Sequence, residues 1–529
     1  MSRFNLIDER WIPVRLPDGT REELGIRDVL LRAREIAEIE DPSPLVVAAL
    51  YRFLLAVLYR ALEGPTDIDQ ANRLCREGIP GARVAAYLER WRERFWLFDE
   101  KNPFYQLPNY EPKGETGKQR WKPLSTIAAE HNGDNTKVLF DHVDARAFDL
   151  IASGKAARWL LACQTFALGG GNSDFKYTKN APSATAVMVL PLGPTLHDTL
   201  ILSLVPENRE VFRSDLPVWE REPESLSSLR AGEDRVVAGW VDLYTWRARS
   251  VRLRLEGDGA TVRALAIASG IACSSADIVD PMLSYRVDEK QGRLAVRFRD
   301  RGLWRDFDSL LPDQSSLAPG VIQHAVALGR LNPRRLPRSI VVLGQKNDQA
   351  KVEYWRMEKF TVPEALLEDP SSRGEIRRLL TEAESAATEL EGSLRLAARL
   401  IMAKGKRDLP RDKWSAGRWI PGDVSRFIGK GGFEVVPPVS ASFWSDLEPR
   451  FHDMLLMFTR RRDPEDTRRV WLEAVRNALA AAWEQHRVAT SPGDAWAIRA
   501  LVRAEGRVLR KLKELSREIA NLAPKPEAA

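Results

Sequence analysis

Two His-Asp dipeptides come closest, in this sequence, to a set of catalytic residues. His197-Asp198 and His452-Asp453 offer the imidazole and carboxylate groups that bind metal ions in phosphohydrolases. Such a site needs further ligands in a coordinated set, and the 529-residue chain has only six histidines. It also has no G-x-x-x-x-G-K-[ST] phosphate loop, no HExxH zinc motif and no serine nucleophile elbow. The sequence therefore argues, mainly by absence, against a self-contained enzyme. A metal-dependent nuclease or phosphohydrolase stays open as an alternative.

The cysteines give no further catalytic or metal site. Cys75, Cys163 and Cys273 stand far apart and form no CxxC pair. A cysteine-based zinc site and a disulfide scaffold are therefore not expected, and a reducing cytosol is the expected compartment. We predict no metal and no cofactor.

Two polar segments have the composition of loops that contact nucleic acid. Gly169-Gly170-Gly171-Asn172 follows an apolar, helix-like run at 159–168. Successive glycines expose backbone N–H groups and allow positive φ, so a groove can approach the backbone closely. The second segment, 344–351, separates an apolar run from a mixed strand and includes Asp348 and Gln349. It predicts a hairpin with a long polar tip. A structural turn and a solvated tip remain the simpler interpretations of the two segments.

Basic residues are patterned but not in large excess. Arg293, Arg297 and Arg299 alternate with apolar residues, which predicts a strand with an arginine face. Lysines and arginines also recur at helical spacing between residues 499 and 517. The net charge, 80 − 74 = +6, permits a nucleic-acid partner without demanding one. A solvated face is the alternative for both patterns.

Mixed elements must position these segments in the first part of the chain. An apolar run at 45–62, starting after Pro44, predicts a helix. Because Arg52 and Arg60 interrupt it and it is short for a membrane span, we predict a buried core helix and no membrane partner. A second helix is predicted over 81–95, an irregular segment over 102–135, and strands over 184–360, including Val251, Leu253 and Leu255 alternating with arginines.

From residue 363 the apolar period changes to 3.6. Four helices are predicted at 363–403, 443–462, 464–488 and 492–522, with starts at Asp463-Pro464 and Ser491-Pro492. A long connection is expected at 404–440. The predicted fold class is α+β: a large mixed α/β N-terminal domain, 1–362, followed by a C-terminal four-helix bundle, 363–529.

A set of short motifs in this order resembles a known family. The motifs are the opening Phe4-Asn5-Leu6-Ile7-Asp8 with Trp11-Ile12-Pro13-Val14, then Asn102-Pro103-Phe104, the three glycines, Asp348-Gln349-Ala350 and the terminal helices. Together they resemble the CasA family, the large subunit of the type I-E CRISPR Cascade complex, over nearly the whole chain. The fold that the resemblance implies is the same mixed domain followed by a four-helix bundle.

The resemblance also implies a function and partners. The expected protein is a non-catalytic subunit of an RNA-guided antiviral complex in a prokaryotic cytoplasm. It recognises the protospacer-adjacent motif (PAM) in duplex DNA and starts strand separation. It contacts the 5′ handle of the guide RNA and other Cascade subunits, and it helps to recruit a helicase-nuclease. A scaffold that binds only protein stays open as another alternative.

The resemblance assigns roles to particular residues. Gly169, Gly170 and Gly171, with Asn172, resemble the loop that meets the PAM in the minor groove, whose code is degenerate. Gln349, preceded by Asp348, resembles a wedge that inserts beside the PAM. The predicted path for incoming DNA carries Arg286, Lys290 and Arg297. The predicted contacts to the guide-RNA handle are Phe140, expected to stack on a base, with Asp141 and His142.

Overall fold

The structure is a computed structural model that divides into two compact units. The N-terminal unit is Met1–Leu303 with Ser309–Phe360, and the C-terminal unit is Trp304–Asp308 with Thr361–Ala529. The residues that the structure describes are 4–112, 121–128, 149–170, 175, 179–232, 234–256, 260–274, 278–290, 292–311, 317–332, 337, 339–348, 351–369, 371–403, 428–429, 432–433, 437–458, 463–490 and 495–522.

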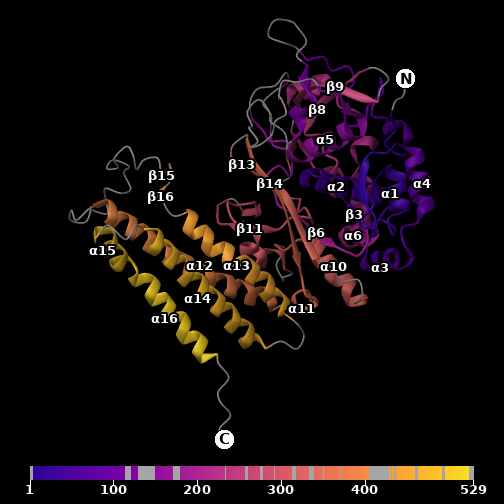
Figure 1. Ribbon diagram of the computed structural model, residues 1–529. Helices are drawn as coiled ribbons and strands as arrows, with labels where there is room; N and C mark the ends of the chain where they lie inside the picture. Colours follow the sequence, from indigo (N-terminus) through magenta and orange to yellow (C-terminus); the bar gives the residue numbers. More distant parts are fainter. Residues whose placement is uncertain are drawn as a thin grey trace. The chain divides into compact units, whose positions relative to one another are not determined.

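Helix α2 (Pro44–Leu62) forms the centre of the N-terminal unit (Figure 1). It packs against α5 (Ser153–Phe166), α4 (Gly81–Arg90) and α9 (Trp240–Tyr244). Among the described residues it alone is long and apolar enough to span a membrane, with a mean hydropathy of 1.9, but 94% of that stretch is buried inside the protein. A helix that is apolar on all sides belongs in a core. The predicted buried core helix is therefore confirmed.

Arg52 shows how this helix accommodates a charge in the core. Its side chain is 1% exposed, and its Nη1 lies 2.6 Å from Oδ2 of Asp280. The guanidinium also lies over the ring of Tyr244, 4.1 Å from the ring centre. A buried guanidinium is tolerated when a carboxylate and a ring face compensate its lost hydration.

Two sheets carry most of the strand content of the N-terminal unit. In the first, β9 (Thr261–Ser269) pairs antiparallel with β8 (Arg249–Glu256), β4 (Lys122–Pro123) and β5 (Ile151–Ala152). The alternation predicted for β8 is confirmed at Val251 and Leu253, which are buried, but an irregularity between Arg254 and Leu255 interrupts it and Leu255 is only half-buried. The second sheet has the order β14-β13-β6. Its strands are β6 (Met188–Leu192), β13 (Ser339–Asp348) and β14 (Lys351–Thr361).

The hairpin of β13 and β14 differs from the prediction. The sequence suggested a long polar tip at 344–351, but β13 continues as a strand to Asp348 and β14 begins at Lys351. Only two residues separate the strands, so they must run antiparallel. Strand β13 pairs with β6 from Ser339 to Leu343. Beyond Leu343 it continues beside β14, and Figure 1 shows the two as long neighbouring strands.

The smaller elements complete the N-terminal unit. Its remaining strands form the sheet β2-β1-β3, the antiparallel ribbon β11-β12 and the parallel pair β10-β7. Their bounds are β1 (Ile12–Arg15), β2 (Arg21–Leu24), β3 (Glu38–Ile39), β7 (Asp234–Val236), β10 (Ala272–Ser274), β11 (Tyr285–Asp288) and β12 (Gly292–Ala295). The other helices are α1 (Ile26–Leu31), α3 (Ile68–Glu77), α6 (Leu196–Ser203), α7 (Arg209–Ser214), α8 (Leu226–Ala231) and α10 (Gly320–Leu331), with 3-10 turns η1 (Arg92–Arg94), η2 (Leu124–Ile127) and η3 (Val218–Glu220).

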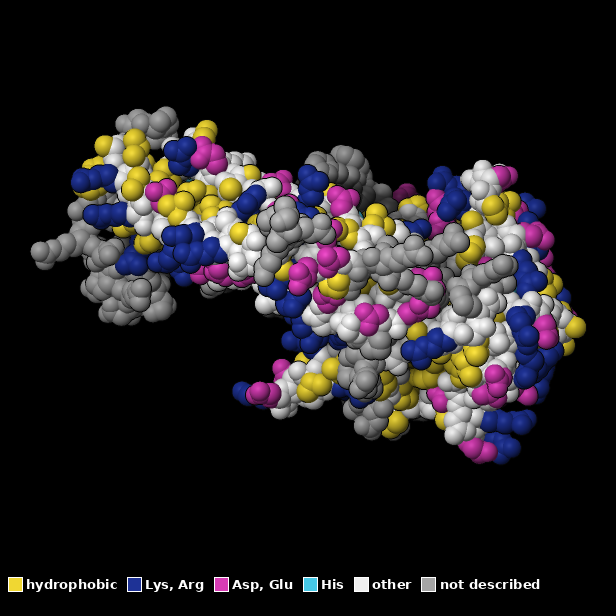
Figure 2. Space-filling view, turned by 90° about the horizontal axis from the view of Figure 1, so that it is seen from below, with side chains coloured by type: hydrophobic (Ala, Val, Ile, Leu, Met, Phe, Trp, Pro, Cys, Tyr) yellow, Lys and Arg dark blue, Asp and Glu magenta, His cyan; other side chains and the backbone are white. Residues whose placement is uncertain are grey.

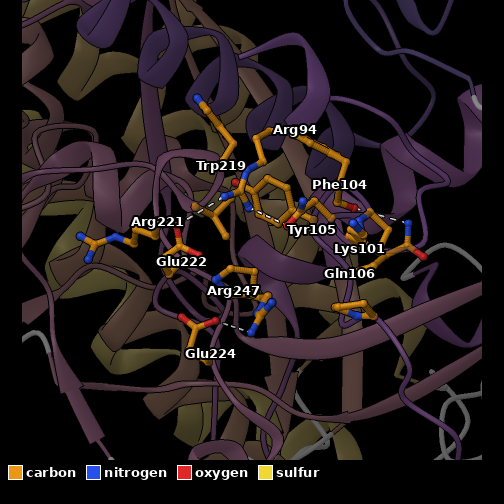
Figure 3. A pocket seen from close by; sticks show the side chains of 15 residues that line it. Arg94, Lys101, Phe104, Tyr105, Gln106, Trp219, Arg221, Glu222, Glu224 and Arg247 are labelled. Atoms are coloured by element: carbon orange, nitrogen blue, oxygen red, sulfur yellow. Dashed lines mark hydrogen bonds and ion pairs between the residues drawn. The ribbon is translucent and has the colours of Figure 1, made fainter. Parts of the chain in front are cut away.

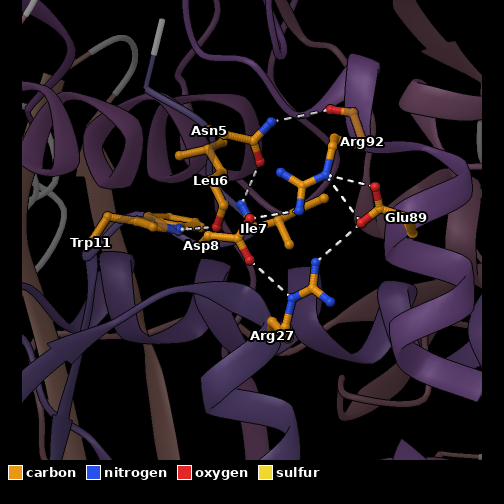
Figure 4. Close-up of polar contacts among 8 residues, drawn as sticks. All are labelled: Asn5, Leu6, Ile7, Asp8, Trp11, Arg27, Glu89 and Arg92. Atoms are coloured by element: carbon orange, nitrogen blue, oxygen red, sulfur yellow. Dashed lines mark hydrogen bonds and ion pairs between the residues drawn. The ribbon is translucent and has the colours of Figure 1, made fainter. Parts of the chain in front are cut away.

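Hydrogen bonds and ion pairs connect the residues of the opening sequence motif with one another and with neighbouring helices (Figure 4). The Oδ1 atom of Asn5 accepts the N–H of Ile7 at 3.0 Å, and the indole N–H of Trp11 donates to the Leu6 carbonyl at 2.8 Å. Asp8 pairs with Arg27 at 2.9 Å and with Arg92 at 2.6 Å, and these hydrogen bonds lower the pKa of its carboxyl although partial burial opposes them. These contacts give the motif a structural role.

The C-terminal unit consists mainly of helices, as predicted, with differences in their bounds, among them the start of the helix predicted at 443–462, which lies at Pro437. The helices are α11 (Glu364–Glu368), α12 (Ser372–Ala403), α13 (Pro437–Leu456), α14 (Pro464–Ala489), α15 (Ala495–Ala504) and α16 (Gly506–Asn521), and a short pair, β15 (Ile428–Gly429) and β16 (Gly432–Phe433), precedes α13. The first predicted helix is divided into α11 and α12, and the last into α15 and α16. Asp463 caps α14 by accepting the N–H of Glu465 at 2.9 Å, as predicted. The α+β fold class with a terminal helical bundle is confirmed.

A segment that precedes the bundle by more than fifty residues belongs to its core. It lies in η4 (Leu303–Leu310). The ring of Trp304 lies 5.1 Å from that of Phe451, and the ring of Phe307 lies 5.4 Å from the same ring. Between them, Arg305 pairs with Glu384 at 2.7 Å and stacks on Trp444. Aromatic packing of this kind fixes Trp304–Asp308 among α12, α13 and α14.

Candidate nucleic-acid interface

The described ends of the glycine loop lie side by side. After α5, the carbonyl of Ala167 accepts the N–H of Ala181 at 2.8 Å. The N–H of Gly169 donates to Oδ1 of Asn180 at 2.5 Å. Gly170 is exposed and has a φ of 122°, a conformation that favours glycine. Gly169 and Gly170 therefore stand where the two described ends of this loop meet. Gly171 and Asn172 lie outside the described residues.

Arg249, at the start of β8, forms hydrogen bonds to both described ends of this loop. Its guanidinium donates to the carbonyls of Leu168 at 2.6 Å and Lys179 at 2.9 Å. The residue is 5% exposed, and this burial lowers the pKa of its guanidinium from the usual value. A charged group in such a place needs acceptors, and the loop carbonyls supply them.

Gln345 connects the hairpin to the same loop. Its side chain is buried, and Nε2 donates to the carbonyl of Phe166 at 2.8 Å and to that of Ala184 at 2.8 Å. The preceding Gly344 lets the strand approach, because a Cβ there would lie 2.6 Å from the carbonyl oxygen of Ala186. The stem of the hairpin is thus fixed against both ends of the glycine loop.

The opposite face of the hairpin is held by ion pairs. Lys346 Nζ lies 2.6 Å from Asp300 Oδ1 and 2.5 Å from Glu353 Oε2. Partial burial opposes its charge, but these two carboxylates raise the pKa of Lys346 overall. Farther along β14, Arg356 donates to the Arg301 carbonyl at 2.8 Å. The basic segment that follows β12 therefore lies along the hairpin. Asp348 ends β13, and Gln349 lies outside the described residues.

The predicted DNA path lies on and beside the ribbon β11-β12. Arg286 pairs with Leu294 across the ribbon, and Val287 pairs with Arg293. Directly opposite residues share a face, so Arg286 and Arg293 lie on different faces. Lys290 occupies the turn, where its N–H donates to Asp288 Oδ1 at 2.9 Å. Arg286, Lys290 and Arg297 are all exposed.

The prediction that Arg293, Arg297 and Arg299 share one strand face is wrong. Strand β12 ends at Ala295. At the next residue, Val296, the N–H still donates to the Ser284 carbonyl in the register of the ribbon, at 2.8 Å, but the carbonyl accepts the N–H of Val187 at 3.0 Å. Arg297 thus follows the strand and lies outside the ribbon.

One short segment is the common neighbour of all these elements. Residues 181–188 begin at the end of the glycine loop, pass the Gln345 amide at Ala184 and reach β6. There Met188 pairs with Leu343 of the hairpin and bridges to Leu283 beside the ribbon. The glycine loop, the hairpin and the root of the ribbon are therefore assembled on one segment. Phe140, Asp141 and His142 lie outside the described residues, so the guide-RNA contact stays a prediction.

The surface charge of the protein is mixed. Figure 2 shows Lys and Arg side chains in small groups among Asp and Glu on the face that it draws. This agrees with a net charge of only +6. Phosphate contacts on such a surface would come from local groups such as the ribbon.

A pocket beside the Asn102-Pro103-Phe104 motif is too small for a nucleotide (Figure 3). It has a volume of about 40 Å³, room for about one water molecule. Arg247 pairs with Glu224 at its wall, and Arg94 donates to Asn102 Oδ1 at 2.9 Å. Phe104 is 2% exposed and stacks on Phe95. The motif thus contributes to the hydrophobic core of the N-terminal unit.

The His-Asp pairs do not form a metal site in the part of the chain that the structure describes. His197 is 2% exposed inside α6, and Asp198 bonds to Oγ1 of Thr195 at the start of that helix. In α13, Asp453 lies 3.8 Å from Arg450. The described residues include no group of three or more His, Cys, Asp or Glu side chains placed to hold a metal ion. The hydrolase interpretation finds no support there.

The roles of Arg249 and Gln345, whose side chains hydrogen-bond to both sides of the glycine loop, were not predicted from the sequence. Arg249 lies two residues before the predicted alternation of Val251, Leu253 and Leu255 and was given no role, and Gln345 belonged to a tip whose simpler interpretation was a solvated one. The only signal for either was a position beside an apolar run: Gln345 follows residues 340–343, and Arg249 precedes Val251.

The fold thus defines a mixed α/β unit that carries a glycine loop and a polar hairpin, joined in sequence to a helical bundle. The family model for CRISPR-associated protein Cse1 matches residues 5–482. CRISPR-associated protein CasA/Cse1 of Thermus thermophilus is 34% identical over 527 residues, which cover 98% of this chain and 99% of that protein. The solved structure of Thermus thermophilus CasA (Cse1) has a TM-score of 0.79 at 32% identity, covering 97% of this chain and all of that one.

A more distant structure agrees in fold. A chain of a CRISPR RNA-guided surveillance complex has a TM-score of 0.71 at 20% identity, covering 96% of this chain and 99% of that one. The chain described here therefore belongs to the Cse1 (CasA) family of CRISPR-associated proteins, as its motifs predicted.

Proposed function

We propose that this chain is the large subunit of an RNA-guided antiviral surveillance complex, and that it recognises the PAM in duplex DNA and starts strand separation. The observation that carries the proposal is the junction at Gln345. A glycine loop suited to a groove and a hairpin suited to a wedge are held together by its side-chain hydrogen bonds. Reading a site and opening the next base pair require two such elements at a fixed spacing.

The loop carries out the reading step in this proposal. Gly169, Gly170 and Gly171, with Asn172, meet the minor groove, where a side chain would clash and backbone groups can face the base edges. Because the minor-groove pattern is degenerate, several related PAMs are accepted.

The hairpin carries out the opening step. Gln349, next to Asp348 at the end of β13, inserts beside the PAM and takes the place of a stacking partner. Unstacking costs about a few kcal/mol per step, which PAM contacts and guide pairing offset. Arg286, Lys290 and Arg297 neutralise phosphates of the incoming duplex, while Phe140, with Asp141 and His142, contacts the handle of the guide RNA.

The proposed subunit does not cut DNA. Cleavage belongs to a helicase-nuclease that the complex recruits, and the other Cascade subunits hold the guide. The similar chain of a solved surveillance complex supports this assembly, and the prokaryotic cytoplasm is the proposed compartment.

The test is target binding by the reconstituted complex across a library of randomised PAM sequences. The proposal predicts enrichment of a small set of related PAMs and binding that weakens as salt rises. Equal binding to every PAM would overturn it. Incubation of the pure chain with labelled DNA and divalent metal serves as the control for the nuclease alternative, which predicts cleavage. The protein-only scaffold predicts that removing the chain leaves duplex binding by the complex unchanged.

A further inference from the structure

Gln345 occupies an unusual position for a strand residue. Its two neighbours along β13 are Gly344, which allows close approach to Ala186, and Lys346, which pairs with acids on the other face. Its own side chain is 2% exposed and points away from those acids into the protein. The amide donates both bonds to backbone carbonyls 179 and 161 residues away in the sequence, at Phe166 and Ala184.

Those two carbonyls belong to opposite sides of the glycine loop. Phe166 is the last residue of α5, directly before Ala167 and the glycines. Ala184 follows the return of the chain, three residues after Ala181, which bonds back to Ala167. One amide group therefore spans the loop base, and it does so from a strand that ends three residues farther on, at Asp348.

We infer that Gln345 is a positioning residue that couples PAM reading to strand opening. This inference rests on the proposed function of the loop and the hairpin. The two amide hydrogens fix the base of the loop relative to the stem of the hairpin. A displacement of either element is transmitted to the other, because the amide cannot move without losing a bond to a buried carbonyl. The spacing between the base-reading loop and the opening wedge is thereby set by one side chain.

Arg249 differs from Gln345 in this respect. It bonds to both sides of the loop, at Leu168 and Lys179, but its own strand, β8, is not part of the hairpin sheet. Loss of Arg249 should loosen the loop alone. Loss of the Gln345 amide should uncouple the loop from the hairpin as well.

The test uses Gln345→Met, which keeps the length and the buried volume of the side chain but removes both donors. Gln106→Met is the matched control. Gln106 is also buried in the N-terminal unit, and its amide group likewise bonds to backbone, donating to Leu97 at 2.6 Å and accepting from Leu253 at 2.8 Å. The two variants lose comparable hydrogen bonds, so a general loss of stability affects both.

Two targets separate the two steps in the reconstituted complex. In the first target, the base pair that follows the PAM is mismatched between the two DNA strands, so this pair needs no opening. The affinity of this target with a good PAM, divided by its affinity with a poor PAM, therefore measures PAM reading alone. The second target is fully paired. The affinity of the mismatched target divided by that of the fully paired target, both with a good PAM, measures the opening of the first base pair. We expect Gln345→Met to reduce PAM discrimination and to weaken opening, each by about tenfold, because a lost hydrogen bond is worth about that factor. Gln106→Met should change neither, even where its melting temperature falls equally.

The outcomes distinguish this inference from the proposed function. If Gln345→Met changes only one of the two ratios, or changes both no more than Gln106→Met does, the coupling role is overturned. If Gly170→Asp and Gln349→Ala leave the same ratios unchanged as well, the proposed function itself is wrong. If those two variants act as proposed and Gln345→Met does not, only the coupling fails.

Discussion

Arg249 and Gln164 exchange two hydrogen bonds across 85 residues of sequence. The N–H of Arg249 donates to Oε1 of Gln164 at 2.8 Å, and Nε2 of Gln164 donates to the carbonyl of Arg249 at 2.9 Å. This reciprocal pair fixes the start of β8 against α5, so the guanidinium of Arg249 is held at the base of the glycine loop. The glycine loop is thus held by the guanidinium of Arg249, and the backbone of Arg249 is itself held by Gln164.

Arg249→Met should loosen the loop. The change keeps an apolar side chain but leaves the carbonyls of Leu168 and Lys179 without these donors, which should lower the free energy of unfolding by about 1–3 kcal/mol. PAM discrimination by the complex should fall in parallel. Urea unfolding of the isolated chain and competition binding measure the two effects.

The control for this change is Arg252→Met on the same strand. Arg252 is partly exposed and pairs with Glu111, and such a pair contributes at most about 1 kcal/mol. It should leave PAM discrimination unchanged. If Arg249→Met lowers stability but not discrimination, Arg249 supports the fold and not the reading step.

Gly170→Asp should abolish PAM-dependent binding with the fold intact. Gly170 has a φ of 122° on the surface, and aspartate would add both a side chain and a negative charge next to the DNA phosphates of the proposed complex. Gly19→Asp is the matched control, because Gly19 also has a positive φ, 89°, and its Cβ would meet nothing within 4 Å. Both variants should lose similar stability, by about 1 kcal/mol. Unchanged discrimination in Gly170→Asp would remove this loop from the PAM site.

Lys290→Ala combined with Arg297→Ala should weaken binding to all sequences alike. Two lost phosphate contacts should reduce the slope of log K against log salt by about two. Arg73→Ala combined with Arg230→Ala removes two exposed charges from α3 and α8 and should leave the slope unchanged. A changed PAM preference with an unaltered slope would mean that Lys290 and Arg297 read bases.

His324 predicts a pH dependence of stability. Burial lowers the pKa of this histidine from 6.5 to about 4, although its ring nitrogen lies 3.2 Å from the Ile201 carbonyl. The unfolded chain takes up the proton below pH 6.5 while the folded chain does not until about pH 4. The contribution of His324 to stability should therefore be fully present above pH 6.5 and should fall by about 3 kcal/mol as the pH drops to 4.

The measurement is urea unfolding of the isolated chain between pH 8 and pH 4. His324→Gln should be less stable at pH 8 and should lose the histidine contribution to the pH dependence. His452→Gln, at a partly exposed position of α13, is the control and should retain the wild-type profile. An unchanged pH dependence in His324→Gln would show that His324 does not cause it.

Much of the fold follows from local sequence pattern. The apolar residues of α2 and the proline at its start predict a buried helix, and Asp463-Pro464 predicts the start of α14, because each signal acts within a few residues. The break between α15 and α16 was missed, since Glu505 keeps near-helical angles of −66° and −18° and the apolar period continues through it.

The site was predicted less well because its contacts are distant in sequence. A polar residue is buried when its hydrogen-bond partners happen to lie in the core, and those of Gln345 come from two segments more than 160 residues away. No local pattern could place them. The end of β12 has the same origin, because the carbonyl of Val296 accepts the N–H of Val187, which belongs to a segment distant in sequence.

The wedge role of Gln349 is tested by comparing the binding of two DNA targets to the complex that carries Gln349→Ala. Both targets carry an intact PAM and full guide complementarity, and in one the first pair after the PAM is mismatched between its own DNA strands. The substitution shortens only the wedge, so the isolated chain should melt as the wild type does. If Gln349 is the wedge, the duplex binds poorly, since unstacking costs about a few kcal/mol, while the mismatched target binds nearly as well as it does to the wild type. Equal weakening of both targets, or of neither, would contradict the wedge role of Gln349.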